Sequence, residues 1–197
     1  EVATGLGRLG SMIEYIKQES IPDIVVFGKM LTAGYLPLAV TLSTENIYNT
    51  FLSESDEFKH LFHGHTFTGN PIGCATAIAN LELYRKEKLI DSVQRKSRII
   101  EKRLDEIKDL EIVGDLRHKG MMVGIELVND KKSKKPFVVK KKKTKYLIME
   151  ESLKRGVFLR PLGHVLQLVP PLAIPIRELN TLIDTTIEII KHIQKIK

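Results

Sequence analysis

One lysine, Lys29, stands in the setting that most strongly suggests chemistry. It follows an apolar, β-branched run at residues 24–27, and a second apolar run at residues 36–42 begins after the turn residues Gly34 and Pro37. We expect two buried strands with Lys29 at the end of the first. Burial would favour the neutral amine, and a neutral amine can attack a carbonyl to form a Schiff base. The alternative is a solvent-facing lysine at a strand end, which composition alone favours.

A second group lies in the segment HGHTFTGNP, residues 63–71. The hydroxyl of Thr66 and the free backbone N–H groups around it precede a predicted helix that begins near Asn70. Such N–H groups and the start of a helix suit an anion. A helix-capping cluster without a ligand explains the same residues at least as well, and we expect Asn70 to cap the helix.

Two arginines are further candidates. Arg160 precedes Pro161 at the end of a predicted strand, where a guanidinium could bind a carboxylate through two parallel hydrogen bonds. From the residues alone, a surface arginine is the better interpretation. Arg8, in the glycine-rich start of the chain, is a weaker candidate, and His63 is expected to support its loop. We assign no metal ligands.

The pattern of helices and strands predicts two parts of the chain that differ in the order of these elements. Residues 1–86 are expected to alternate helices and strands, which indicates a parallel or mixed α/β sheet. Residues 87–197 are expected to form a separate, small α+β domain. The expected helices are 11–19, 45–52 (capped by Thr44), 70–85, 91–110, 140–155 (ended by Gly156) and 178–196, and the further strands are 111–116, 121–128, and a hairpin of 157–160 with 165–169 around Gly163.

Composition narrows the class of protein. The chain has 197 residues, 43% of them hydrophobic, a single cysteine and a formal net charge of +7. One cysteine excludes a disulfide framework and fits the cytoplasm. No apolar stretch approaches the roughly 18 residues of a membrane span, so we expect no membrane association. The lysine runs at 131–135 and 140–143 lack interleaved aromatic residues, so we interpret them as solvated loop and expect no nucleic-acid binding.

Three segments together resemble one family, the class III pyridoxal-phosphate aminotransferases. Residues 1–10 (EVATGLGRLG), 22–37 (PDIVVFGKMLTAGYLP) and 63–71 resemble that family's stretches DEVxTGFGRTG, PDIxxxGKxLxGGYxP and HGxTFxGNP, in the same order and spacing. Within the family, RPLG at 160–163 followed by VPP at 169–171 most resembles the adenosylmethionine–8-amino-7-oxononanoate aminotransferase subfamily. The resemblance covers essentially the whole chain.

The resemblance implies a fold, a cofactor and roles for individual residues. The fold would be the fold-type-I transferase, with residues 1–86 as part of the large mixed-sheet domain. Lys29 would hold pyridoxal 5'-phosphate, and the protein would be a homodimer with active sites shared between its subunits. Thr66, with the backbone of His65, would contact the phosphate of the cofactor in the opposite subunit. Gly64 would lie near the small-molecule substrate, and Arg160 would bind the carboxylate of the keto acid.

The implied reaction is an amino transfer to 8-amino-7-oxononanoate, which makes 7,8-diaminononanoate for biotin synthesis, with adenosylmethionine or lysine as the donor. Rival interpretations are a class III enzyme of the ornithine, acetylornithine or 4-aminobutyrate type, and a non-enzymatic basic interaction domain. The sequence departs from the family at Leu9 and Ala33, where the family has Thr and usually Gly. It opens after the position of the family's pyridinium-pairing Asp. This resembles the C-terminal half of such an enzyme, which alone we expect to be inactive.

Overall fold

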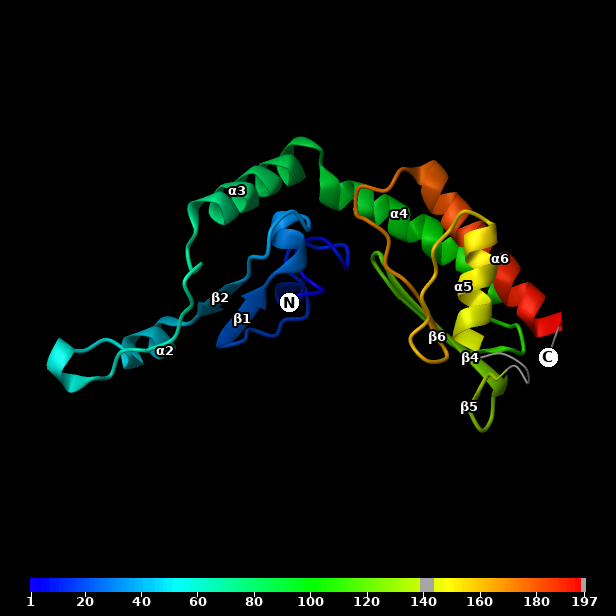
Figure 1. The fold of residues 1–197 in the computed structure, drawn as a ribbon, viewed down its shortest axis with the longest axis horizontal. Helices are drawn as coiled ribbons and strands as arrows, with labels where there is room; N and C mark the ends of the chain where they lie inside the picture. Colours follow the sequence, from blue (N-terminus) through cyan, green and yellow to red (C-terminus); the bar gives the residue numbers. More distant parts are fainter. Residues whose placement is uncertain (139–143, 196–197) are drawn as a thin grey trace. The chain divides into compact units, whose positions relative to one another are not determined.

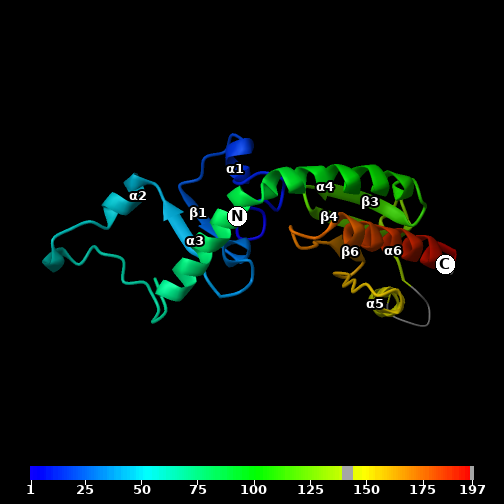
Figure 2. The ribbon, with the colours of Figure 1, turned by 90° about the horizontal axis from the view of Figure 1, so that it is seen from above.

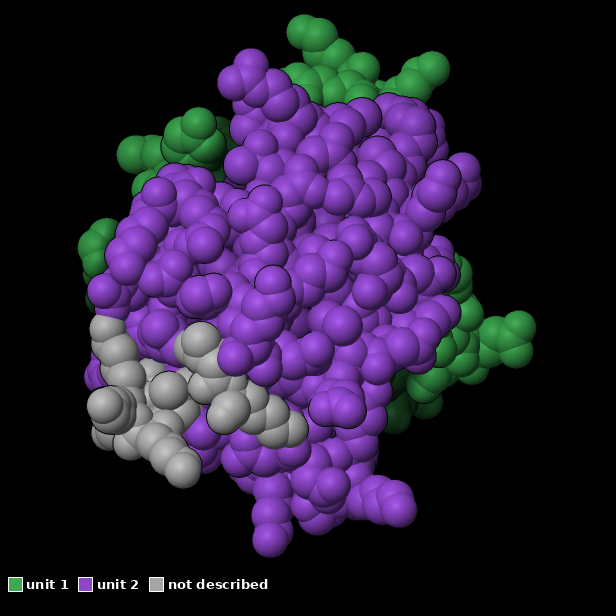
Figure 3. Space-filling view, turned by 90° about the vertical axis from the view of Figure 1, so that its right-hand side faces the viewer, with its two compact units in different colours: residues 1–90 green, residues 91–197 purple. Residues whose placement is uncertain are grey.

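The chain forms two compact units in a computed structural model that describes residues 1–138 and 144–195. Unit 1 is Glu1–Ile90 and unit 2 is Asp91–Lys197, and Figure 3 colours them separately. The boundary after residue 86, between part of a large domain and a small domain, stays a prediction. The lysine run at 140–143 and the expected start of the helix at 140–155 lie outside the described residues.

Unit 1 contains one small sheet and several helical segments (Figure 1). Its elements are α1 (Glu14–Lys17), β1 (Ile24–Phe27), the 3-10 turn η1 (Lys29–Thr32), β2 (Val40–Ser43), α2 (Glu45–Thr50), the 3-10 turn η2 (Ser55–Glu57) and α3 (Pro71–Lys86). The predicted strand at 24–27 and helix at 70–85 are confirmed. The helix expected at 11–19 shortens to the four residues of α1, and Glu19 beyond its end has a left-handed φ of 53°.

The two strands of unit 1 pair antiparallel, with Phe27 opposite Val40 and Ile24 opposite Ser43. A purely parallel sheet, one of the two kinds of sheet predicted, is therefore wrong for this chain. Parallel neighbours need a crossover connection, usually a full helix, whereas residues 28–39 fold back through the single turn η1. The burial expected for both strands is also wrong for this chain, because Phe27 is the one buried residue of β1 and all four residues of β2 are exposed.

The cap predicted for α2 is absent in its expected form. Thr44 occupies the N-cap position, but its side chain makes no capping hydrogen bond. Its Oγ1 is buried without a hydrogen-bond partner among the described residues. The backbone of Thr44 is held nonetheless, because its carbonyl accepts the first helical bond from the N–H of Tyr48 at 3.1 Å and its own N–H donates to the Asp23 carbonyl at 3.0 Å.

Unit 2 is an antiparallel sheet with helices packed against it. Its elements are α4 (Leu89–Leu104, which begins two residues before the unit), the 3-10 turn η3 (Asp105–Ile107), β3 (Val113–Lys119), β4 (Met122–Asp130), β5 (Lys135–Pro136), α5 (Thr144–Lys154), β6 (Val165–Leu168) and α6 (Ile176–Lys195). Strand β4 is central, because β3, β5 and β6 all pair with it. Helices α4 and α6 run side by side along one face of this sheet (Figures 1 and 2).

The core of unit 2 follows from two periodicities in the sequence. Buried residues alternate along β4, as at Val123, Ile125 and Leu127, which is the period of a strand with one covered face. Buried residues on α4 and α6 recur at helical spacing instead. They include Val93, Ile100 and Leu104 on α4, and Leu179, Ile183, Ile187, Ile190 and Ile193 on α6. The apolar faces of both helices therefore pack against the apolar face of the sheet.

The hairpin predicted for residues 157–169 is wrong. Residues 157–160 are not a strand, and β6 pairs with β4 through Leu166 opposite Ile125. An isolated bridge between Leu162 and Val165 is what remains of the expected turn. Gly156 does end α5 as predicted, with a left-handed φ of 73°. Among the described helices, none is long and apolar enough to span a membrane.

Candidate active site

Lys29 opens the turn that connects β1 to β2. Its φ of 42° is left-handed, a region that side chains with a Cβ rarely occupy. The turn ends at Ala33, which is also left-handed with φ 51° and ψ 23°. Ala33 is one of the two departures from the family pattern, and its conformation explains why glycine suits that position. Non-glycine residues held in this conformation cluster at functional sites.

The side chain of Lys29 is exposed. The predicted burial of its amine between two strands is therefore wrong within this chain, and the four residues of β2 are themselves exposed. Within residues 1–138 and 144–195, the amine has no hydrogen bond or ion pair that would occupy it. The amine is accessible to a carbonyl compound, which is the property that a Schiff base requires.

Helix α3 anchors this turn through a residue that the sequence interpretation missed. The Asn80 side-chain amide donates to the carbonyl of Met30 at 2.7 Å and to the carbonyl of Leu31 at 3.1 Å. These are the two residues that follow Lys29. The sequence does carry a signal, because asparagine is a poor helix former and Asn80 stands inside an alanine-rich helix.

A second contact from α3 supports the glycine-rich start of the chain. The hydroxyl of Tyr84, a buried residue, donates to the carbonyl of Leu6 at 2.9 Å. Arg8 is also buried, and its Nη2 lies 3.8 Å from the sulfur of Met30. Burial lowers the pKa of Arg8, an effect that Tyr84 partly opposes, and burial likewise raises the pKa of Tyr84. Arg8 is therefore packed under the turn that carries Lys29.

The loop at residues 63–70 is exposed up to Asn70 and organised by its own hydrogen bonds. The N–H of His65 donates to Thr68 Oγ1 at 3.1 Å, and the N–H of Phe67 donates to His65 Nδ1 at 3.2 Å. Asn70 caps α3 as predicted, because its Oδ1 accepts from the N–H of Gly73 at 2.7 Å. His63, Gly64 and Thr66 belong to the same exposed loop.

The two ends of α3 thus relate to different candidate residues. The loop with Gly64, His65 and Thr66 enters the helix at its N-terminus, whereas Asn80 contacts the Lys29 turn from the C-terminal half. A rise of 1.5 Å per residue separates Asn70 from Asn80 by roughly 15 Å along the helix axis. The structure therefore brings Arg8 and Asn80 against the turn that begins at Lys29, and the loop that contains Thr66 enters α3 at its other end.

Arg160 belongs to unit 2 and follows a tightly held segment. Its side chain is exposed, and among the described residues it has no ion-pair partner. The preceding Leu159 is buried, and its N–H donates to the hydroxyl of the buried Ser152 at 3.2 Å. The backbone is thus fixed one residue before a free guanidinium, which suits a site for a carboxylate.

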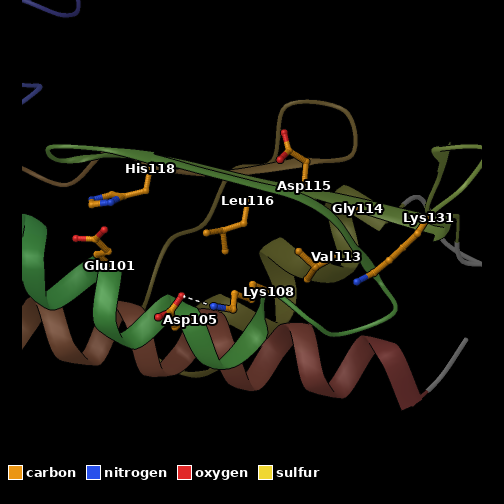
Figure 4. Close-up of a pocket in the computed structure, with 9 residues that line it drawn as sticks. All are labelled: Glu101, Asp105, Lys108, Val113, Gly114, Asp115, Leu116, His118 and Lys131. Atoms are coloured by element: carbon orange, nitrogen blue, oxygen red, sulfur yellow. Dashed lines mark hydrogen bonds and ion pairs between the residues drawn. The ribbon is translucent and has the colours of Figure 1, made fainter.

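Unit 2 also has a groove of about 470 Å³ between β3 and the α4–η3 segment. Figure 4 shows charged side chains along it, with Lys108 paired to Asp105 at 3.1 Å on one wall and His118 on the other. None of the predicted site residues lines this groove. Its lining carries charges of both signs.

The sequence matches the family described as Aminotransferase class-III over residues 1–193. It is 49% identical to the adenosylmethionine-8-amino-7-oxononanoate aminotransferase of Methanocaldococcus jannaschii, over 98% of this chain and 42% of that protein. It is 46% identical to the Aquifex aeolicus protein of the same name, over 99% of this chain and 43% of that protein.

The chain belongs to the class III aminotransferase family. The crystal structure of the M. jannaschii protein superimposes with a TM-score of 0.89 at 48% identity, covering 98% of this chain and 44% of that one. A Bacillus anthracis aminotransferase superimposes with a TM-score of 0.85 at 35% identity, covering 98% and 44%. The predicted α/β fold, that of the fold-type-I transferases, is confirmed by these class III structures. The chain spans less than half the length of the relatives it matches.

Proposed function

We propose that the protein containing this chain is a pyridoxal-phosphate-dependent aminotransferase that converts 8-amino-7-oxononanoate to 7,8-diaminononanoate, a step of biotin synthesis. The observation that carries the proposal is the identity of 49% and 46%, over nearly the whole chain, to two proteins named for this reaction. A relative with another name, the vanillin aminotransferase of Capsicum annuum, is only 31% identical over the same span. This difference favours the biotin-pathway reaction over other class III reactions.

The residues of this chain fit the cofactor that the family uses. A covalent site for pyridoxal phosphate needs an accessible amine, and the exposed amine of Lys29 supplies it. When bound, the cofactor supplies an electron sink for the carbanion that forms at the substrate Cα. Lys29 Nζ would hold the cofactor between reactions, and its free amine would move a proton to and from the substrate Cα.

Arg160 is proposed to hold the carboxylate of the keto acid. Its exposed guanidinium and the fixed backbone at Leu159 support this role. A guanidinium presents donors in a fork that matches a carboxylate, which fixes the orientation of the substrate as well as its position. We place Gly64 near the substrate, where the absence of a side chain leaves room for it.

We further propose a homodimer in which Thr66 and the backbone of His65 contact the cofactor phosphate of the opposite subunit. The separation of roughly 15 Å between Asn70 and Asn80 along α3 supports the proposal, because Asn70 ends the Thr66 loop and Asn80 contacts the Lys29 turn of the same chain. Adenosylmethionine is the proposed amino donor, as in the names of the relatives, with lysine as the alternative. The proposed location is the cytoplasm, which the single cysteine fits.

A chemical trap and a donor panel test the function. The full-length protein is loaded with pyridoxal phosphate, reduced with borohydride and digested, and the labelled peptide is mapped. We expect the label on Lys29, and Lys29→Ala should abolish both label and turnover. The wild type is then assayed with 8-amino-7-oxononanoate and either adenosylmethionine or lysine. A label on another lysine, or no product with either donor, would contradict the proposal.

Mixed dimers test the shared site. Dimers of Thr66→Val chains and dimers of Lys29→Ala chains should each have little or no transaminase activity. The two variants are then mixed under conditions that exchange subunits. If Thr66 acts on the opposite subunit, a hybrid dimer has both lesions at one site and an intact second site, so activity partly returns. Mixing two batches of the same variant is the control. Absence of any recovery, with exchange verified by mass, would show that Thr66 does not act across the interface.

A further inference from the structure

The turn that carries Lys29 has an unusual backbone for its sequence. Lys29 and Ala33 are both left-handed, with φ of 42° and 51°, and Gly34 follows with φ 84°. The left-handed region brings Cβ close to the following carbonyl oxygen, which disfavours it for residues other than glycine. Such a conformation persists only where the surrounding structure imposes it. The left-handed conformation of Lys29 therefore requires contacts from the residues around the turn.

Bonds within the turn close it but connect only its own residues. The N–H of Leu31 donates to the Gly28 carbonyl at 3.0 Å, and the N–H of Ala33 donates to the Met30 carbonyl at 3.3 Å. The hydroxyl of Thr32, which is buried, donates to the Leu36 carbonyl at 2.6 Å. These bonds define a shape for the turn. They do not attach that shape to the rest of unit 1.

Asn80 attaches the turn to α3, in addition to the contact of Arg8 Nη2 with the Met30 sulfur. Its amide nitrogen lies 2.7 Å from the Met30 carbonyl oxygen and 3.1 Å from the Leu31 carbonyl oxygen, and it reaches them from 50 and 49 residues away in the sequence. Asn80 is half-buried on α3, a helix of sixteen residues, and so offers a rigid base. One side chain thereby fixes both peptide carbonyls that follow Lys29.

We propose that Asn80 is a positioning residue, whose amide holds the turn so that the Lys29 amine is presented in one place. The inference rests on the proposed function, in which Lys29 is the reacting lysine. The contact requires a donor. An aspartate at this position is nearly the same size, but when ionised it only accepts, and it would place a negative oxygen against two carbonyl oxygens. An alanine removes the donor without adding a charge.

The test uses the full-length protein with Asn80→Asp and Asn80→Ala, and with Thr76→Ala as the matched control. Thr76 lies one turn earlier on α3, and its hydroxyl donates to the Ile72 carbonyl of the same helix at 2.8 Å. The control therefore loses a side-chain bond on α3 without losing a bond to the turn. Thermal unfolding midpoints are measured first, so that the variants compared are folded.

Two measurements on the cofactor-free protein report on the turn itself. Hydrogen exchange is followed for peptides within residues 28–36, and the rate of acetylation of Lys29 is followed against pH. In Asn80→Asp we expect exchange in the turn to accelerate about tenfold to hundredfold, which is the loss expected for two modest hydrogen bonds. Asn80→Ala should show a smaller acceleration, and the acetylation profile of Lys29 should change in both. Thr76→Ala should match the wild type.

Turnover of the loaded enzyme completes the test. Because the substrates are not expected to touch Asn80, kcat should fall in Asn80→Asp while both KM values stay within about twofold. Unchanged exchange and acetylation in a folded Asn80→Asp variant, or equal changes in Thr76→Ala, would overturn the inference. Failure of the proposed function would be distinguishable, since borohydride would then label a lysine other than Lys29 while exchange in the turn still responded to Asn80.

Discussion

Removal of the Ser152 hydroxyl should loosen the segment that leads to Arg160. Ser152 is fully buried, and its Oγ accepts from the Leu159 N–H at 3.2 Å and donates to the Met149 carbonyl at 2.9 Å. In Ser152→Ala the Met149 carbonyl keeps its ordinary helical bond, but the buried N–H of Leu159 loses its acceptor. A buried donor left without a partner costs about 1–3 kcal/mol.

Hydrogen exchange of the Leu159 amide reports this cost. A loss of about 1–3 kcal/mol in local stability corresponds to exchange of the Leu159 N–H that is roughly 5- to 150-fold faster. Hydrogen exchange with fragmentation of peptides that span residues 152–160 measures it in the intact protein. Because Leu159 precedes Arg160, the KM for the keto acid should rise in the same variant, and the KM for the donor should change less.

The matched control makes the same chemical change where a partner remains. Ser97 Oγ lies 3.3 Å from His118 Nε2, and that nitrogen also bonds to the Gly120 carbonyl at 2.9 Å. Ser97→Ala therefore leaves no group unsatisfied, and its effect should stay within about 0.5 kcal/mol. If Leu159 exchanges at the wild-type rate in Ser152→Ala, or if both variants behave alike, the assigned role of Ser152 is refuted.

Three further predictions concern packing, pH and substrate binding. Gly114→Ala should lower the free energy of unfolding by about 1–3 kcal/mol, because a Cβ there would lie 2.5 Å from Cγ1 of the buried Val128. Gly124→Ala is the control, because the atom nearest to its new Cβ would be 3.7 Å away. Thermal unfolding should show a smaller loss of stability for Gly124→Ala than for Gly114→Ala. Hydrogen bonds from Lys154 and Arg155 lower the pKa of Glu151 to about 2. The contribution of the Glu151 carboxylate to stability is therefore present above pH 5 and is lost as the pH falls toward 2. Glu151→Gln should lower the free energy of unfolding by about 0.5–1 kcal/mol at pH 7 and by much less at pH 2, where the Glu151 carboxyl of the folded protein is about half protonated. Unfolding curves at both pH values would check this. Arg160→Ala should raise the KM for the keto acid about tenfold to hundredfold, the loss of one charge-assisted pair, and equal weakening of both substrates in steady-state kinetics would contradict the carboxylate role.

Local patterns predicted the elements well where the signal lies within one element. The strand at 24–27 has the predicted bounds, and the helices expected at 70–85 and 178–196 are observed as Pro71–Lys86 and Ile176–Lys195. The Asn70 cap and the stop at Gly156 were likewise predictable, because a cap or a left-handed residue acts on its own neighbours. The hairpin at 157–169 failed because the partner of β6 is β4, about 40 residues earlier, and the turn signal at Gly163 carries no information about so remote a strand.

The sequence by itself determined the family and the candidate residues. Motif content and spacing at residues 1–10, 22–37 and 63–71 singled out Lys29 and Thr66 as chemistry-bearing residues, and RPLG at 160–163 with VPP at 169–171 singled out Arg160. These identities depend on side-chain type and order along the chain, which the sequence states directly.

Only the tertiary structure decided how Lys29 is held and exposed. The sequence interpretation buried Lys29 between strands, whereas the structure leaves it exposed on a left-handed turn. It also revealed Asn80 and Ser152, which hold the backbone beside Lys29 and Arg160 from 50 and 7 residues away. The physical reason is that burial and hydrogen-bond partners depend on which surfaces meet in space, and a local pattern of residue types carries no distance between remote segments.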